Sequence, residues 1–133
     1  MHVTGSCHCG FIAYEAEVDP ATARICHCRD CQKLSGSAFR ANVRAEIGKF
    51  RLLSGEPAIY IKTAESGNKR AHAFCPKCGS PVYTTALEQP APHNLRIGAL
   101  DQRAELKPRR RIWCDSMITW SEDISGIEKI GGQ

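Results

Sequence analysis

The sequence predicts a mostly β fold of short antiparallel strands, with little helix and with its loops fastened by bound metal. Three observations support this prediction. Several segments alternate apolar and polar residues with a period of two, as half-buried strands do. Glycine and proline recur at short intervals, so few segments are long enough to form a helix. Seven of the eight cysteines stand in three tight groups.

Length and composition are typical of one small folded unit. The 133 residues contain no internal repeat and no low-complexity linker, so we expect a single domain over residues 1–133. Apolar residues make up 42%, slightly below the usual ~45–50%, and this predicts a thin core. Because a structural zinc ion can supply ~10 kcal/mol or more of apparent folding free energy, the cysteines are the expected source of the missing stability.

Alternation along the chain predicts the strands. Three segments place their apolar residues on one face: Ile12, Tyr14, Ala16 and Val18; Phe39, Ala41 and Val43; Leu95, Ile97 and Ala99. A further strand is predicted over Ala58–Thr63, where β-branched and aromatic residues gather. Helical signals are weak. One short turn is expected at residues 29–34, and residues 122–130 fit a short helix or a final strand equally well.

The grouping of the cysteines favours metal binding over disulfide bonds. They recur at intervals of one or two residues, which suits ligands of one ion better than loop-closing bridges. The N-terminal residues show no basic-then-apolar signal segment, and no run approaches the ~20 apolar residues of a membrane span. We therefore expect reduced thiols in a cytoplasmic protein.

Two cysteine pairs predict a closed four-sulfur site. Cys75 and Cys78 flank Pro76 and precede Gly79, a sequence that forms a tight turn with both thiols on one side. In an extended chain, Cys7 and Cys9 project together, while His8 between them projects away. Each pair needs two more ligands. Joining Cys7, Cys9, Cys75 and Cys78 therefore completes a structural zinc site that ties the N-terminus to the middle of the chain.

The third group predicts a zinc site with an open position. Cys26, Cys28 and Cys31 supply three ligands from one local segment, and an open fourth position is typical of a catalytic zinc. The alternative is a closed site completed by His27, His72 or Cys114. His27 points away from its cysteine neighbours in an extended chain, and Cys114 is expected to be an apolar filler in a buried strand. Cys114 is therefore left out of the ligand set.

Three thiolates weaken the Lewis acidity of a zinc ion, so activation of water is less natural here than at a histidine-rich site. A soft zinc–thiolate centre suits another sulfur instead. A thiol that entered the open position would lose its proton on coordination. The residues therefore favour a small-molecule thiol as substrate.

The motifs resemble the glutathione-dependent formaldehyde-activating enzyme family, which also includes centromere protein V-like proteins. The resemblance spans nearly the whole chain, in order: Gly5-Ser6-Cys7-His8-Cys9-Gly10, Cys26-His27-Cys28-Arg29-Asp30-Cys31, Leu34-Ser35-Gly36-Ser37-Ala38-Phe39, Phe74-Cys75-Pro76-Lys77-Cys78-Gly79, Gly98-Ala99-Leu100-Asp101, and Ile112-Trp113 with Trp120. It implies a zinc-pinned β domain called a β-tent, with a structural and a catalytic zinc on the cysteines assigned above.

The resemblance also implies an activity. The type reaction of the family is that of a carbon–sulfur lyase, which joins formaldehyde to glutathione as S-hydroxymethylglutathione and reverses this step. The chain departs from the family pattern near its end. Arg111 stands where histidine is frequent, Cys114 replaces a small or β-branched residue, and Met117-Ile118-Thr119-Trp120 replaces a Lys-x-Pro-Trp-like segment. If this region shapes the pocket, the substrate differs from the type substrate.

The basic residues leave a second hypothesis open. The formal net charge of +4 falls by about three when seven thiolates bind two Zn²⁺ ions, and aromatic residues are only 7%, so the composition does not favour a nucleic-acid partner. Arginines near an open zinc could orient the carboxylates of glutathione. The candidates are Arg24, Arg29, Lys33, Arg40 and Arg109-Arg110-Arg111. The alternative is a non-catalytic zinc module that binds a protein or nucleic-acid partner through this basic face.

Overall fold

A computed structural model describes residues 1–64 and 66–132. Eight strands form one sheet: β1 (His2–Ser6), β2 (Ala13–Cys26), β3 (Arg40–Ser54), β4 (Ala58–Thr63), β5 (Lys69–Phe74), β6 (Pro81–Ala86), β7 (His93–Arg96) and β8 (Arg110–Ile112). The helical elements are α1 (Arg29–Ser35) and the 3-10 turns η1 (Ile97–Ala99), η2 (Arg103–Glu105), η3 (Cys114–Ser116) and η4 (Thr119–Glu122). None of the described helices is long and apolar enough to cross a membrane.

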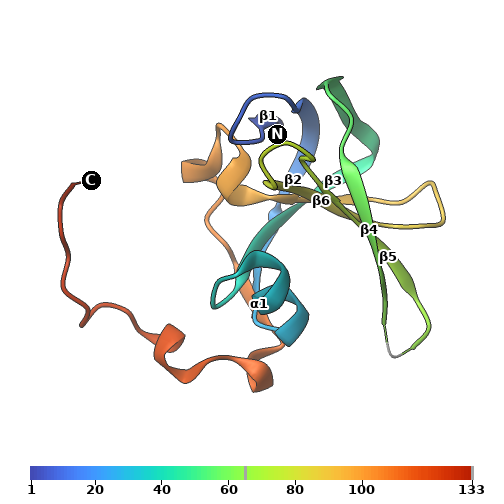
Figure 1. Cartoon of the computed structure of the whole chain (residues 1–133). Helices are drawn as coiled ribbons and strands as arrows, with labels where there is room; N and C mark the ends of the chain where they lie inside the picture. Colours follow the sequence, from blue (N-terminus) through green and yellow to red (C-terminus); the bar gives the residue numbers. More distant parts are fainter. Residues whose placement is uncertain (65, 133) are drawn as a thin grey trace.

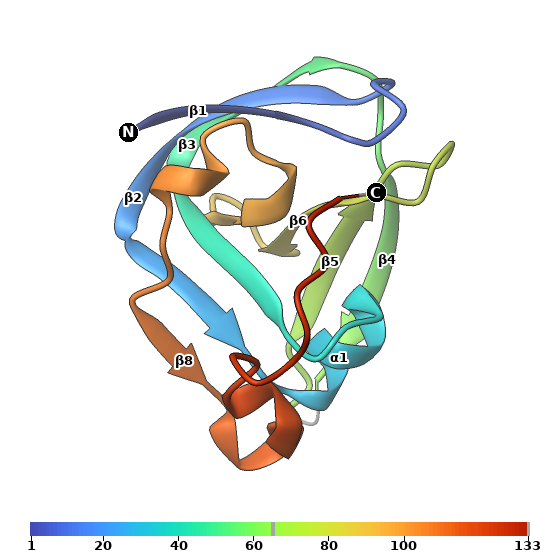
Figure 2. The same ribbon diagram turned by 90° about the vertical axis from the view of Figure 1, so that its left-hand side faces the viewer.

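The sheet is antiparallel except at one strand, which confirms the predicted fold class. The strand order is β1-β2-β3-β7-β6-β5-β4, and β8 pairs in parallel with β2. The sheet is strongly curved, and α1 lies near one end of its long strands (Figures 1 and 2). The two central strands are longer than expected, at 14 and 15 residues, because register shifts in the β2–β3 pairing let them bend rather than end.

The predicted alternation of β2 is confirmed, and it builds the core. Ile12, Tyr14, Ala16 and Val18 are all buried, and their neighbours in sequence are more exposed. Leu95 of β7 and Val43 of β3 meet this face from the adjoining strands. The core is closed by residues beyond the sheet, chiefly Leu100 and Leu106. The core includes Cys7 and Cys75, one member of each cysteine pair.

Three predictions for the later part of the chain are wrong. The strand pattern expected at Leu95, Ile97 and Ala99 stops at Arg96, because η1 turns the chain and the Leu100 amide donates to the Ile97 carbonyl at 3.0 Å. Cys114 is exposed in η3 rather than buried in a strand, since β8 ends at Ile112. Residues 122–130 contain neither the expected helix nor a strand, apart from the end of η4. The segment after η4 projects from the body of the molecule (Figure 1).

Candidate metal centres

Four sulfur atoms gather where the start of the chain meets the β5–β6 connection. The Sγ atoms of Cys7, Cys9, Cys75 and Cys78 lie within 4.8 Å of one another. Cys7 and Cys9 are 3.6 Å apart, and Cys9 and Cys75 are 3.8 Å apart across 66 residues of sequence. The pairing expected from spacing alone therefore occurs in the structure.

Tight turns, rather than a strand, bring these sulfurs together. β1 ends at Ser6, so Cys7 and Cys9 do not share a face of an extended chain as predicted. The amide of Gly10, at φ +80°, instead donates to the Cys7 carbonyl at 3.2 Å. The second pair follows the prediction, since the amide of Gly79 donates to the Cys75 carbonyl at 2.8 Å, with φ +78° at this glycine. Both turns need the left-handed backbone that glycine adopts without strain.

The second sulfur cluster lies at the junction of β2 and α1. The Sγ atoms of Cys26, Cys28 and Cys31 lie within 4.8 Å of one another. Cys26 is the last residue of β2, and Cys28 caps α1 by accepting a hydrogen bond from the Cys31 amide at 3.2 Å. The helix expected at residues 29–34 is present and extends to Ser35. One turn of helix thus carries the third sulfur back toward the first two.

Hydrogen-bond donors surround the sulfur atoms of both clusters. In the four-sulfur cluster, the Ile12 amide donates to Cys7 Sγ at 3.2 Å, and hydrogen bonds from Ser80 lower the pKa of Cys78 to about 5. In the three-sulfur cluster, the guanidinium of Arg40 donates to Cys31 Sγ at 3.0 Å. Such donors stabilise thiolates, which are the metal-binding form of cysteine.

The thiols of Cys26 and Cys31 compete for one proton. The hydrogen bond between Cys26 and Cys31 lowers the pKa of Cys26 and, together with burial, raises the pKa of Cys31. Cys31 therefore holds its proton more tightly than Cys26, even with the Arg40 guanidinium beside it. A cation placed among the three sulfurs would remove this conflict, because it stabilises every thiolate that touches it.

The donor atoms fit zinc. All eight cysteines are free, so no disulfide competes for the seven clustered sulfurs. With Zn–S bonds of about 2.3 Å, a tetrahedral zinc site has sulfur–sulfur edges of about 3.8 Å. The 3.6 and 3.8 Å separations in the four-sulfur cluster match this edge. An all-sulfur donor set also selects zinc or other soft metals over magnesium and calcium. Both clusters can therefore hold a metal ion, and their composition is consistent with zinc.

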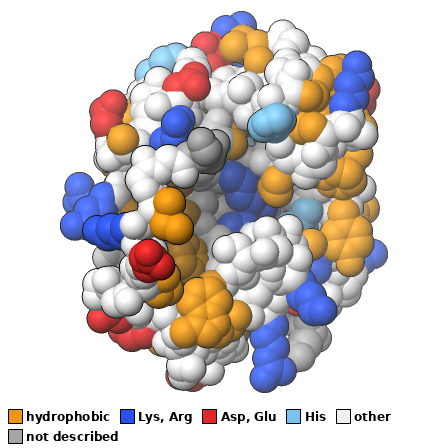
Figure 3. All heavy atoms as spheres, turned by 60° about the vertical axis from the view of Figure 1, so that its left-hand side comes forward, with side chains coloured by type: hydrophobic (Ala, Val, Ile, Leu, Met, Phe, Trp, Pro, Cys, Tyr) orange, Lys and Arg blue, Asp and Glu red, His pale blue; other side chains and the backbone are white. Residues whose placement is uncertain are grey.

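Both clusters border a cavity, and Cys7 of the four-sulfur cluster lines one of about 700 Å³. A cavity of about 140 Å³ opens beside Cys26, Cys28 and Cys31. Its other lining residues come from the strands and include five cations, namely Arg24, Arg40, Lys62, Arg70 and Arg96. Two larger cavities, of about 400 and 700 Å³, share Arg40 and Arg96 with it. Lys or Arg side chains are visible at the floor of a hollow on one face of the molecule (Figure 3).

The structure places some of the predicted basic residues at this cavity and others away from it. Arg24 and Arg40 line it, as expected from their closeness in sequence to the cysteines. The triplet Arg109-Arg110-Arg111 is exposed, and Arg111 pairs with Glu122 at 3.1 Å. Sequence reasoning missed Arg96. In a strand with Leu95 and Ile97 on the buried face, an arginine between them is expected to point to solvent. In the structure, Arg96 lines the cavity at the three-sulfur cluster.

The groups considered as a fourth ligand lie outside the three-sulfur cluster as far as the described residues show. His72 lines the same cavity, and burial, with nearby cations such as Arg40, lowers its pKa to about 4. His27 is buried against the ring of Phe39, with a 5.6 Å separation of ring centres. Of the nearby candidates for acid–base chemistry, Asp30 is paired with Lys62, and Ser35 donates to backbone carbonyls at 3.4 Å.

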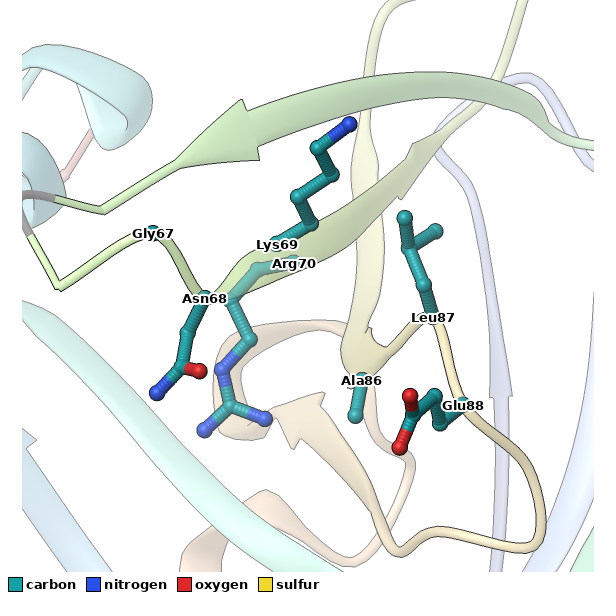
Figure 4. A pocket seen from close by; sticks show the side chains of 7 residues that line it. All are labelled: Gly67, Asn68, Lys69, Arg70, Ala86, Leu87 and Glu88. Atoms are coloured by element: carbon teal, nitrogen blue, oxygen red, sulfur yellow. The ribbon is translucent and has the colours of Figure 1, made fainter.

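A separate cavity of about 620 Å³ lies between the start of β5 and the end of β6, lined by residues 67–70 and 86–88 (Figure 4). Arg70 and Asn68 point to one side of the ribbon in this view, and Lys69 points to the other. No cysteine lines it. Arg70 also lines the three-sulfur cavity, so this space adjoins the cluster without containing it.

The curved antiparallel sheet and its two sulfur clusters place the chain among β proteins whose cysteine clusters could bind metal. The chain belongs to the glutathione-dependent formaldehyde-activating enzyme family, whose model matches residues 2–116. This confirms the resemblance seen in the motifs. A crystal structure of a Rhodobacter sphaeroides protein is similar in fold, with a TM-score of 0.62 and 21% sequence identity over 81% of this chain and 98% of that chain.

Proposed function

We propose that this protein is a zinc-dependent carbon–sulfur lyase that acts on the adduct of a thiol and an aldehyde. The type reaction would join glutathione and formaldehyde to S-hydroxymethylglutathione. In this step a bond forms between the thiol sulfur and the aldehyde carbon, and the thiol proton passes to the carbonyl oxygen. The observation that carries the proposal is the small cavity that all three sulfurs of Cys26, Cys28 and Cys31 line together with five cations.

The proposal assigns a separate task to each cluster. Cys7, Cys9, Cys75 and Cys78 would hold a structural zinc ion that joins β1 to the β5–β6 connection. Cys26, Cys28 and Cys31 would hold the catalytic zinc ion. When bound there, zinc supplies an electrophilic centre that favours the thiolate form of a substrate thiol. Family membership supports a reaction between a thiol and an aldehyde, because the family is named for a glutathione- and formaldehyde-dependent activity.

The protein side chains would position the reactants. Arg40 holds Cys31 by its hydrogen bond to sulfur, which fixes one wall of the reaction space. The cavity of about 140 Å³ is large enough for a one-carbon aldehyde beside a sulfur atom and too small for a whole peptide-sized thiol. The rest of the thiol substrate would therefore extend into the adjoining cavities of about 400 and 700 Å³. Holding both reactants together is the main source of acceleration for such a step.

A single domain over residues 1–133 in the reduced cytoplasm is the setting we propose for this chemistry. The alternative, a non-catalytic zinc module, has support in the exposed Arg109-Arg110-Arg111 segment, which could meet an acidic partner. The cations nearest the three sulfurs instead line a cavity, which suits a small molecule better than a macromolecule. We therefore prefer the enzyme to the non-catalytic module as the proposed function.

The test is the rate of adduct formation. Zinc-loaded protein, glutathione and ¹³C-labelled formaldehyde are mixed, and magnetisation transfer by NMR measures exchange between free aldehyde and S-hydroxymethylglutathione. The proposal predicts a rate above the spontaneous one that grows with protein concentration and is lost in Cys28→Ser. A rate equal to the spontaneous one at all protein concentrations would support the non-catalytic alternative.

A further inference from the structure

We propose that two copies of this chain form a symmetric dimer by pairing their β4 strands edge to edge. The two strands run antiparallel in this dimer, so that the sheet of one copy continues into the sheet of the other. The occupant of the β4 edge is therefore a second copy of the chain. This interface does not depend on the proposed chemistry, because it uses the outer edge of the sheet rather than the sulfur clusters.

The rest of the chain covers one edge of the sheet, at β1. The amide of Thr4 donates to Gln102 Oε1 at 2.9 Å, and its carbonyl accepts a hydrogen bond from the Asp101 amide at 2.9 Å. Gly5 also forms an antiparallel bridge with Leu100. The backbone groups on the outer side of β1 are thus already paired at these positions. A further strand cannot add to this edge without displacing the segment that follows η1.

The opposite edge of the sheet, at β4, has no such cover among the described residues. β4 pairs with β5 over all six of its residues without a register shift, and it is the last strand in the sheet order (Figure 2). Edge strands are usually protected by a bulge, a proline or a free charge. The charged residue of β4, Lys62, is instead paired with Asp30 of α1. The outer side of β4 therefore presents a regular row of backbone donors and acceptors to a further strand.

The apolar face of the core continues onto β4 and ends there in contact with solvent. Leu95, Tyr83, Ala73 and Ile59 lie opposite one another in successive strands, so they share one face of the sheet. Leu95 is 0% exposed and Ala73 is 2% exposed, whereas Ile59 is 47% exposed. Ile61, the next residue on this face of β4, is 50% exposed. A strand added beyond β4 would extend the face and bury both isoleucines.

The sequence of β4 is complementary to itself in an antiparallel pair. A two-fold axis normal to the sheet keeps the core faces of both copies on the same side, so residues of like face oppose each other. When Tyr60 opposes its own copy, Ile59 opposes Ile61 of the second copy, and this apolar pair forms twice. Glu56, just before β4, then lies diagonally across from Lys62 of the second copy. This match in hydrophobicity and charge selects a second copy over an unrelated strand.

The dimer is expected to close at two copies and to be weak. Pairing through β4 uses the uncovered edge of both sheets, and the covered β1 edge leaves no place for a third copy. One six-residue strand from each copy makes a small interface, below ~1,200 Å², so we expect a Kd of about 1–100 µM. Tyr60 also lines the cavity of about 400 Å³, so the second copy would stand beside this cavity.

Analytical ultracentrifugation of the zinc-loaded full chain tests the dimer. Sedimentation velocity from about 2 to 500 µM should show a change from monomer to dimer. Ile59→Lys and Ile61→Lys each place two lysines in the interface and should raise the Kd at least about tenfold. The matched control is Ile47→Lys on β3, because this isoleucine is 56% exposed and lies outside β4. Its Kd should stay within about twofold of the wild type.

Hydrogen–deuterium exchange of the wild type locates the interface without any substitution. Amides of residues 58–63 should exchange more slowly at about 500 µM than at about 2 µM, because outward-facing amides gain partners in the dimer. Amides of residues 2–6, at the covered edge, should not change. A monomer at every concentration would overturn the proposal and leave β4 to a strand of another protein. Assembly beyond two copies, a dimer retained in both lysine variants, or concentration-independent exchange in β4 would also overturn it.

Discussion

Cys28 shows how one side chain serves both the fold and the proposed chemistry. Its sulfur accepts the hydrogen bond from the Cys31 amide that caps α1, and the same sulfur belongs to the three-sulfur cluster. The helix therefore begins directly after Cys28, and its first turn brings the sulfur of Cys31 back to the other two. Arg40 of β3 contacts the same three-sulfur cluster. It is the strand-pairing partner of Cys26, and its guanidinium donates a hydrogen bond to Cys31 Sγ.

At the residue scale, Gly5 is fixed by packing. A Cβ atom at this position would lie 2.6 Å from Cζ of Tyr14, which is 1% exposed in the core. We expect Gly5→Ala to lower the free energy of unfolding by about 1–3 kcal/mol, because the ring or β1 must shift. Urea unfolding measures this change. The control is Gly98→Ala, whose Cβ would meet no atom within 4 Å, and it should change stability by less than about 0.5 kcal/mol. Equal stability of both variants would contradict the packing argument.

At the element scale, β7 brings a titrating side chain into an aromatic cluster. The ring of His93 stacks on Phe50 at 4.8 Å and meets the edge of Tyr83 at 4.6 Å. Burial lowers the pKa of His93, and a hydrogen bond to the Ala91 backbone opposes the shift in part. The neutral ring is therefore the form that fits between β3 and β6.

The pH dependence of stability follows from this packing. Because the pKa of His93 is lower in the folded state, the unfolded chain binds more protons once the pH falls below about 6.5. Stability should decrease from pH 7.5 to pH 5, and His93→Phe should show a smaller decrease in urea unfolding. Part of the decrease should remain, because burial also lowers the pKa of His72 to about 4. An unchanged decrease in His93→Phe would refute this assignment.

The elements that sequence could predict are those fixed by local spacing. Alternation identified the buried face of β2, and a gathering of β-branched and aromatic residues gave the bounds of β4. The spacing of cysteines identified which sulfurs meet. Spacing did not give the geometry of Cys7 and Cys9, where a turn at Gly10 replaces the expected extended chain. The exposed position of Cys114 was also missed, because nothing local shows that β8 ends at Ile112.

The cation-lined cavity could not be predicted, because it is a product of topology. Arg96 reaches the cysteines only because β7 pairs with β3, which in turn pairs with β2. These contacts join residues that are 54 positions apart, as in the bond from Arg96 to Asn42. Alternation in a strand shows which residues share a face, and the sheet order then determines what that face meets.

At the scale of the whole molecule, the four-sulfur cluster joins distant parts of the chain, and the three-sulfur cluster is local. Cys78→Ser should therefore yield little folded protein, because the zinc it removes is expected to supply ~10 kcal/mol or more, comparable to the whole stability of a small domain. Cys28→Ser should fold, since a serine hydroxyl also caps a helix. Soluble yield and circular dichroism measure both. Similar behaviour of the two variants would contradict the division between a structural and a catalytic cluster.

The most direct test of that division is zinc counting. Elemental analysis of protein purified without added metal should find two zinc ions per chain in the wild type and one in Cys28→Ser. Glutathione titrated into the wild type should give a saturable binding signal that is absent from this variant. One zinc ion or none in the wild type, or the same count in both proteins, would contradict the central claim that each sulfur cluster holds its own zinc.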